Sequence, residues 1–326
     1  MTGPTDGPRL PRGRGELSEA VLAYLRGSGE APAPAMADEA DPYGEDLHLA
    51  LYSCYELHYR GFAGVDPARE WDPPLLEFRG ALERRFETAL RQDAPPGAGL
   101  TETLDSLLVE PVRGTGLSHV LEESGTLDQL RAYAVQRSLY HLKEADPHAW
   151  VLPRLSGRAK AGMAAIEYDE FGAGRAERVH ARLFADLMAD LGLETSYGHY
   201  VDEGHAEMLA LVNLMSLFGL HRRLRGALVG HFGAVEITSS PSSRRLALAM
   251  KRAEAGPAAE HFYTEHVEAD AVHEQIVRHD VIRGLLDDEP ELEADVVFGI
   301  EATGRLEDRL AARLLSDWSC APPAGS

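Results

Sequence analysis

Two histidines and an aspartate near the C-terminal end of the chain have the spacing of metal ligands on one face of a helix. The segment reads His266-Val-Glu-Ala-Asp270-Ala-Val-His273. Positions i, i+4 and i+7 of a helix point the same way, so the three side chains share one side. Helical bundles use such nitrogen and oxygen donors to hold transition metals between helices. A purely structural role is the alternative, and other candidate ligands must decide between the two.

Glu236 is a single carboxylate in a segment that otherwise lacks charge. It is the only Asp, Glu, Lys or Arg between Arg225 and Arg244. Burying an unpaired carboxylate is costly, so a residue of this kind needs a proton, a cation or a metal. A hydrogen bond to the turn at 238–240 or a pair with His231 would be the alternatives to a metal.

A third candidate site lies on the helix expected at 176–192. His180 is in line with Phe184 on the apolar side of this helix, where a lone histidine is more often hydrogen-bonded than metal-bound. Glu177 precedes it by three residues, and Glu-x-x-His is a pair with which di-iron carboxylate bundles bind metal. Ordinary surface charge in the first turn of the helix is the alternative for Glu177.

Two further glutamates stand at the ends of expected helices, in His141-Leu-Lys-Glu144 and in Glu167-Tyr-Asp-Glu170. Each alone is a weak signal, because acidic residues near helix ends are common. Together with the residues above they spread carboxylates and histidines over four helices, which is enough for two iron or manganese ions. The predicted ligands are Glu144, Glu170, His180, Glu236, His266, Asp270 and His273, with Glu177 as the alternative to Glu170.

The elements that must position these ligands are predicted to be helices. Apolar residues recur with helical periodicity in nearly every segment, and none shows the two-residue alternation of a strand. Proline, glycine and serine predict breaks at 72–74, 95–99, 146–147, 172–174 and 239–241. The predicted helices span residues 44–62, 73–92, 101–109, 117–145, 156–171, 176–192, 199–237, 242–254, 258–285 and 290–315.

The order and spacing of the candidate ligands resemble those of the haem-oxygenase-like di-iron oxidases and oxygenases, also called iron-containing redox enzymes. The His-x3-Asp-x2-His of 266–273 resembles the third ligand helix of that family. Glu236 lies where the family has a bridging carboxylate, and His180 with Glu144 resembles the pair from the first two ligand helices. One branch of the family has an additional carboxylate at the position of Glu170, and another favours the position of Glu177.

The resemblance implies an all-α, haem-oxygenase-like helical bundle with an N-terminal helical extension. It also implies two Fe(II) ions, with manganese as an alternative metal, and O₂ as co-substrate. Family members act on small amine- or carboxylate-bearing substrates by N-oxygenation, desaturation or oxidative C–C cleavage, and the fold does not choose among these reactions. We therefore predict a di-iron oxidoreductase. The helix that carries 266–273 is expected to order as the metal binds, because a ligand-dense helix repels itself without metal.

Composition and periodicity set the expected domain organisation, and the resemblance adds the bounds of the di-iron core. Residues 1–38 are rich in Pro, Gly and Ala and are expected to form a flexible tail, interrupted by a short amphipathic piece. Residues 39–318 are expected to form a single all-α domain, whose di-iron core spans about 120–315.

Two other classes of protein fit parts of the pattern. A ferritin-like di-metal carboxylate protein would use Glu177-x2-His180 and Asp270-x2-His273, but that pattern has no use for His266. A non-enzymatic iron-binding or helical interaction protein would leave the segment at 266–273 structural. His266 is therefore the residue that best separates these classes.

Composition limits partners and location. The net charge of −21 argues against nucleic-acid and anionic-membrane partners. The two cysteines fit a reducing compartment, and the absence of a basic-then-apolar signal sequence predicts a cytoplasmic location. We expect a small-molecule substrate, with electrons from an external donor or from the substrate, and the sequence is compatible with a homodimer. The arginines of the segments 221–225 and 244–245 could bind a substrate carboxylate, but solvated basic turns are the more common role of such segments. Tyr140 could relay electrons, although nothing in the sequence singles it out.

Overall fold

The computed structural model describes residues 7–93, 99–109 and 114–320, and these residues form helices without any strand. The prediction of an all-α fold is confirmed. The helices are α1 Glu16–Leu25, α2 Glu45–Glu56, α3 Pro73–Asp93, α4 Leu100–Leu108, α5 Leu117–Ser124, α6 Leu127–His141, α7 Asp146–Ala149, α8 Gly157–Glu170, α9 His180–Asp190, α10 Ala206–Leu220, α11 Arg225–Arg252, α12 Pro257–Ile276, α13 Arg283–Asp288 and α14 Glu293–Cys320. A π-helical segment, Val277–Ile282, joins α12 to α13.

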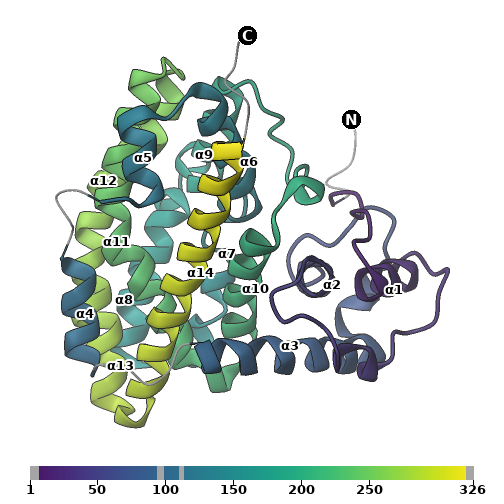
Figure 1. Ribbon diagram of the computed structural model, residues 1–326. Coiled ribbons are helices and arrows are strands. Elements are labelled where there is room, and N and C mark those ends of the chain that lie inside the picture. Colours follow the sequence, from purple (N-terminus) through teal and green to yellow (C-terminus); the bar gives the residue numbers. More distant parts are fainter. Residues whose placement is uncertain (1–6, 94–98, 110–113, 321–326) are drawn as a thin grey trace.

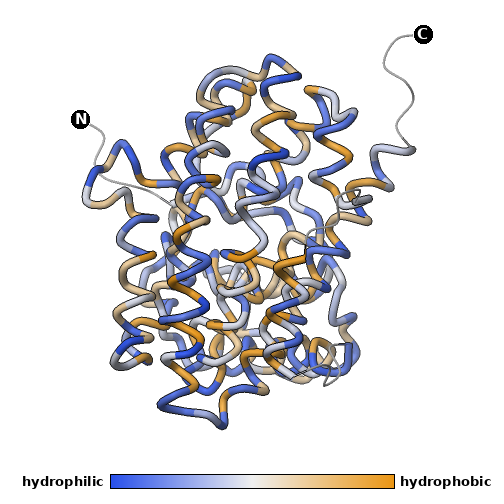
Figure 2. Tube along the Cα trace, turned by 90° about the vertical axis from the view of Figure 1, so that its left-hand side faces the viewer, coloured by the Kyte–Doolittle hydropathy of each residue, from blue (hydrophilic) through white to orange (hydrophobic). Residues whose placement is uncertain are grey.

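The long helices α11, α12 and α14 form the centre of the bundle (Figure 1). Helix α11 packs along both of the others, and α12 also packs on α9. Close approach of α11 and α14 requires glycine, because a β-carbon at Gly230 would collide with the carbonyl of Val296. The same holds for Gly299 and the carbonyl of Ala227. Apolar and polar stretches alternate along most helices (Figure 2), as expected where each helix buries one face.

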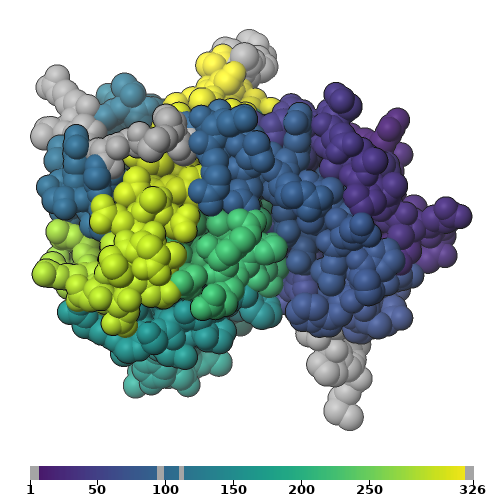
Figure 3. All heavy atoms as spheres, turned by 90° about the horizontal axis from the view of Figure 1, so that it is seen from below, coloured from purple at the N-terminus to yellow at the C-terminus, as the bar shows by residue number. Residues whose placement is uncertain are grey.

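Helix α10 lies between the bundle and the N-terminal part of the chain. It is buried on nearly all sides, and a helix without a polar face belongs in the interior of a protein. It contacts α2, α6, α11 and α14. Residues 7–93, which contain α1 to α3 and which we call the N-terminal extension, pack on the other side of α10 (Figures 1 and 3).

The extension differs from its prediction. Residues 1–38 were expected to be a flexible tail; residues 1–6 lie outside the described part, but from residue 7 onward the segment packs against the protein. Val21 and Leu22 of α1 are fully buried. The carboxylate of Asp46 accepts hydrogen bonds from the backbone N–H groups of Leu17 (2.9 Å) and Ser18 (2.8 Å) at the start of α1. The amphipathic helix therefore finds an apolar partner in α2, which composition alone did not reveal.

Several helix boundaries also differ from the prediction. The break expected at 239–241 is wrong, because α11 continues through Pro241. Hydroxyl groups next to the proline bond to α12 instead: Ser239 donates to Asp270, and Ser240 donates to the carbonyl of Val267 at 3.2 Å. The chain breaks at 221–224 instead, within the predicted helix 199–237.

Two further predicted segments are divided or shortened. A capping box of Thr126 and Gln129 starts α6 and splits the predicted helix 117–145. The helix expected from 176 begins only at His180. The break expected at 95–99 falls almost entirely outside the described residues. None of the helices in the described part of the chain is long and apolar enough to cross a membrane.

The packing of α1 leads to a stability prediction. Replacing the fully buried Leu22 by Ala should lower the free energy of unfolding by about 2–4 kcal/mol, because the substitution leaves a cavity at a site without solvent access. Glu19→Ala, at an exposed position of the same helix, is the control and should change it by less than about 0.5 kcal/mol. Urea denaturation measures both. Equal, small effects of the two substitutions would show that α1 does not contribute to the folded core.

Candidate metal centre

The predicted ligands come from five different elements and are all buried. Glu144 lies in the turn of residues 142–145 that follows α6, and Glu170 is the last residue of α8. His180 begins α9, Glu236 lies within α11, and α12 carries the other three. Their exposed fractions are between 2% and 8%. The structure thus brings all seven into the interior of the bundle, while the alternative residue, Glu177, is exposed.

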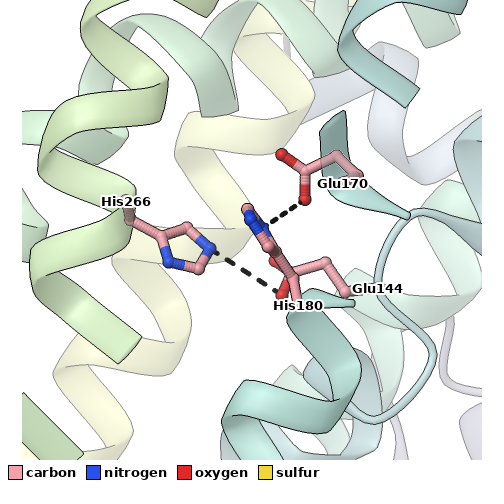
Figure 4. Close-up of side chains that lie close together, drawn as sticks. All are labelled: Glu144, Glu170, His180 and His266. Atoms are coloured by element: carbon pink, nitrogen blue, oxygen red, sulfur yellow. Dashed lines mark ion pairs between the residues drawn. The ribbon is translucent and has the colours of Figure 1, made fainter. Parts of the chain in front are cut away.

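Four of these residues form a first group, Glu144, Glu170, His180 and His266 (Figure 4). One possible ligand atom from each lies within 4.8 Å of all the others. His180 Nδ1 is 2.7 Å from Glu170 Oε2, and His266 Nε2 is 3.9 Å from Glu144 Oε2. Two carboxylates and two imidazoles in this arrangement are a suitable donor set for iron or manganese.

A second group consists of Glu170, Glu236 and His273, whose ligand atoms also lie within 4.8 Å of one another. His273 Nδ1 is 3.2 Å from Glu236 Oε2 and 3.5 Å from Glu170 Oε1. Glu170 therefore belongs to both groups, with one oxygen toward each. The family resemblance implied Glu236 as a bridging carboxylate; among the described residues, Glu170 is the carboxylate that belongs to both groups.

Asp270 lies next to the second group without being part of it. Its Oδ1 is 3.6 Å from His273 Nδ1, and its Oδ2 accepts a hydrogen bond from Ser239. The side chain is 2% exposed. Asp270 can therefore complete the second site through Oδ1 while Ser239 holds its other oxygen.

Hydrogen bonds leave one ring nitrogen of His266 and one of His273 directed at the cluster. His266 Nδ1 lies 2.7 Å from the carbonyl oxygen of Phe262. Because a carbonyl oxygen only accepts, Nδ1 must carry the proton, and neutral His266 then presents a lone pair on Nε2. His273 Nε2 lies 3.0 Å from Asp169 Oδ2, which in the same way leaves Nδ1 for a metal.

The first group contains polar atoms that lack a partner. Among the described residues, Glu144 Oε2, His180 Nδ1 and His266 Nε2 are buried without a hydrogen bond. The short contact between His180 and Glu170 is an ion pair without the alignment of a hydrogen bond. Buried polar atoms are rarely left unpaired. Three of them converging on one point are what an absent metal ion would leave, so the residues fit a metal.

Electrostatics agree with this geometry. Burial raises the pKa of Glu144 and of Glu236 to about 8. Burial alone would lower the pKa of His273, but its hydrogen bonds to Asp270 and Glu236 outweigh this and raise the pKa to about 11. Without a metal, the cluster therefore holds protons to limit its negative charge, and a divalent cation would replace them.

Sequence reasoning missed several residues around the cluster. Glu167, one turn before Glu170 on α8, has two buried oxygens without a hydrogen bond among the described residues, and burial raises its pKa to about 9. His141 Nδ1 lies 2.8 Å from Glu144 Oε1. The i, i+3 spacing of Glu167 and Glu170 was a usable signal. The i, i+3 spacing of His141 and Glu144 was a signal of the same kind, whereas the contact of Asp169 with His273 depends on tertiary packing and left no signal in the sequence.

A cavity of about 440 Å³ adjoins the cluster. Glu144, Glu170, Glu236, His266 and Asp270 contribute to its wall. The rest of the lining comes from α4, α5, α6, α10, α11, α12 and α14 and is mostly apolar, with hydroxyl groups from the 238–243 part of α11. A small organic molecule could therefore lie next to the candidate metal centre.

A chain of hydrogen bonds between neutral groups runs along the wall of this cavity, which Tyr140, His148 and Thr303 help to line. Thr303 Oγ1 donates to the carbonyl of Gly299 (2.7 Å), so it accepts from His231 Nδ1 at 2.8 Å. His231 Nε2 then accepts from His148 Nε2 at 3.1 Å. His148 Nδ1 is left to accept a long hydrogen bond, 3.5 Å, from the hydroxyl of Tyr140 on the cavity wall. Tyr140 thus has a neutral base as its partner.

Comparison with known proteins agrees with this picture. Residues 131–308 match a sequence family described as iron-containing redox enzyme. The matched range includes every candidate ligand and leaves out the N-terminal extension. A search of curated proteins gave no match.

The buried carboxyls make the stability of the metal-free protein depend on pH. Folding raises the pKa of Glu144 and Glu236 from 4.5 to about 8, so their contribution is complete below pH 4.5 and is lost as the pH rises through 8. We expect the free energy of unfolding to fall by on the order of 3 kcal/mol per group between pH 6 and pH 9. Urea denaturation in the presence of a chelator measures this fall.

Glu236→Gln removes one of these buried carboxyls and should reduce the fall. Adding a divalent metal at pH 8 should restore stability to the wild type and release protons. An identical pH dependence in wild type and Glu236→Gln would contradict the assignment of these buried carboxyls as proton holders.

Proposed function

The chain belongs to the iron-containing redox enzymes, and from this we propose that it is a non-haem di-iron, O₂-activating oxidase or oxygenase. Its substrate would be a small amine- or carboxylate-bearing molecule, oxidised by N-oxygenation, desaturation or oxidative C–C cleavage. The observation that carries the proposal is the pair of buried donor groups that share Glu170. A carboxylate with one oxygen toward each group is suited to join two ions at a short distance.

The residues of the two groups have distinct tasks in this proposal. Glu144, Glu170, His180 and His266 would hold one Fe(II), and Glu170, Glu236 and His273, with Asp270 beside them, would hold the other. Manganese is the alternative metal. Bound iron would supply the electrons for activating O₂. The carboxylates neutralise the charge of the ions, and the surrounding apolar helices exclude water.

His266 favours this proposal over a ferritin-like di-metal protein. Its Nε2 is directed at the first group by the hydrogen bond from Nδ1 to Phe262, whereas a ferritin-like pattern has no place for a histidine one turn before Asp270. The orientation of an unpaired nitrogen is also difficult to explain in a purely structural helix.

The cavity supports a small organic substrate. Its volume of about 440 Å³ is in the range of pockets for small ligands. Arg245 contributes to the wall and donates to the hydroxyls of Ser118 (3.0 Å) and Ser242 (3.3 Å). This guanidinium and its hydroxyl neighbours form a polar region suited to a substrate carboxylate, while apolar residues line most of the remaining wall.

Partners and location complete the proposal. The sequence has no dinucleotide or flavin fingerprint, so we propose that electrons come from another protein or from the substrate. The net charge of −21 supports a protein without nucleic-acid or membrane partners. We retain a cytoplasmic location as part of the proposal, and a homodimer is compatible with it.

Metal stoichiometry tests the proposal. Under anaerobic conditions the purified protein should bind about two Fe(II) per chain. His266→Ala and His273→Ala should each reduce this to about one, because each removes a ligand from a different group. His48→Ala, which removes a buried histidine of α2 that bonds Asn213, is the matched control and should leave the stoichiometry unchanged. Iron analysis after gel filtration gives the numbers.

Other outcomes would separate the alternatives. Uptake of many iron ions per chain on exposure to O₂ would indicate storage instead of catalysis. Unchanged iron binding in His266→Ala would support a ferritin-like site, and no binding by the wild type would contradict any iron enzyme. Small amines and carboxylic acids that accelerate O₂ consumption by the iron-loaded protein would identify the substrate class.

A further inference from the structure

The turn that carries Glu144 is held by residues outside the matched family region. Helix α6 ends at His141, and Ala145 has a left-handed backbone conformation (φ 65°) before α7 begins at Asp146. The backbone N–H of Glu144 makes only a long hydrogen bond, 3.4 Å, to the carbonyl of His141. The position of this ligand therefore depends on what fixes residues 142–145 from outside the turn.

A buried ion pair provides the first anchor. Lys143 Nζ lies 3.0 Å from Oε2 of Glu56, the last residue of α2. The exposed fractions are 1% for the lysine side chain and 0% for the glutamate side chain. The hydroxyl of Tyr197 donates to the same carboxylate, at 2.7 Å from Oε1 and 2.8 Å from Oε2. Both charges are thus fully enclosed and paired.

Aromatic rings enclose the ammonium group. Lys143 Nζ lies 4.4 Å from the ring centre of Tyr59 and 5.0 Å from that of Tyr52, within the range of cation–π attraction. Removing one partner of a buried ion pair leaves an uncompensated buried charge and is strongly destabilising, so Lys143 and Glu56 are held together. The pair thereby holds the turn against the extension.

Arg60 provides a second anchor to the same turn. Its Nη2 donates to the carbonyl oxygen of Leu142 at 3.2 Å. The guanidinium carbon lies 4.0 Å from the ring centre of Tyr197, the residue that also bonds Glu56. Leu142 and Lys143 are therefore both fixed by the extension, while the next residue, Glu144, contacts His141 and faces His266.

We propose that the N-terminal extension positions the metal ligand Glu144, with Glu56, Lys143 and Arg60 as positioning residues for the first donor group. Adjacent side chains of the turn contact opposite sides: Lys143 binds the extension and Glu144 faces the cluster. The extension is therefore part of the construction of the metal site. This inference rests on the proposed function where it concerns metal, but the ordering of the turn can be measured without metal.

Glu56→Gln tests the inference, because it keeps the shape of the side chain and leaves Lys143 as a buried cation without a counter-charge. Lys143 should then move, and the turn should open. In the metal-free protein, amide hydrogen exchange at residues 142–145 should become at least about tenfold faster. The affinity of one of the two Mn(II) sites should fall by about tenfold or more, as when a residue that orients a metal ligand is lost, while the other site keeps its affinity.

Glu83→Gln is the matched control. Glu83 is another buried carboxylate of the extension, but it bonds Tyr55 (3.0 Å) and His221 (2.9 Å) and not the turn. This variant should change neither exchange at 142–145 nor Mn(II) affinity. The double variant Glu56→Gln with Lys143→Met, which removes both charges, should recover part of the affinity lost in Glu56→Gln.

Two outcomes would overturn the inference. Unchanged exchange at 142–145 in Glu56→Gln would show that the pair does not hold the turn, whether or not the protein binds metal. Faster exchange with both Mn(II) affinities unchanged would show that the turn does not position a ligand. Absence of metal binding by the wild type would instead reject the proposed function, and the exchange measurement would still decide whether the extension orders the turn.

Discussion

The burial of several carboxylates in one place is the constraint on which the rest of the structure depends. Glu144, Glu170, Glu236 and Asp270 are all at most 8% exposed, and the histidines 180, 266 and 273 lie among them. Such a concentration of charge in an apolar interior is unfavourable without protons or cations. The raised pKa values of Glu144 and Glu236 are the response of the metal-free protein. A pair of divalent ions would neutralise the buried negative charge that raises these pKa values.

Helix packing and hydrogen bonds from neighbouring residues hold the candidate ligands close together despite their like charge. Close contact between α11 and α14 at Gly230 sets the position of the helix that carries Glu236. Hydroxyl groups of α11 connect it to α12, as in the hydrogen bond from Ser239 to Asp270. Beyond His273, α12 continues into the π-helical segment Val277–Ile282, in which Val277, Val281 and Ile282 are buried. A π-helical segment next to a ligand helix is a frequent feature of functional sites. The turn with Glu144 depends in the same way on the extension.

Much of the site could be predicted from local sequence, because helical spacing determines which side chains share a face. The i, i+4, i+7 pattern of His266, Asp270 and His273 and the isolation of Glu236 both gave usable signals, and the structure buries these residues together. The sharing of Glu170 could not be predicted, because it depends on how α8, α9 and α12 meet. The continuation of α11 through Pro241 also depends on tertiary contacts, since hydroxyls bonded to α12 compensate for the proline. The prediction of a flexible N-terminal segment failed for the same reason. Composition shows the content of Pro, Gly and Ala, but it does not show that the apolar side of α1 packs against another helix, α2.

Whether the two donor groups that share Glu170 bind metal ions is tested most directly by anomalous X-ray diffraction from crystals prepared with Mn(II) or anaerobic Fe(II), because this measurement locates the ions themselves. We expect two anomalous peaks on either side of Glu170, one next to Glu144, His180 and His266 and the other next to Glu236 and His273. Peaks only elsewhere in the protein, or no peak next to these residues in crystals that contain the metal, would contradict this expectation.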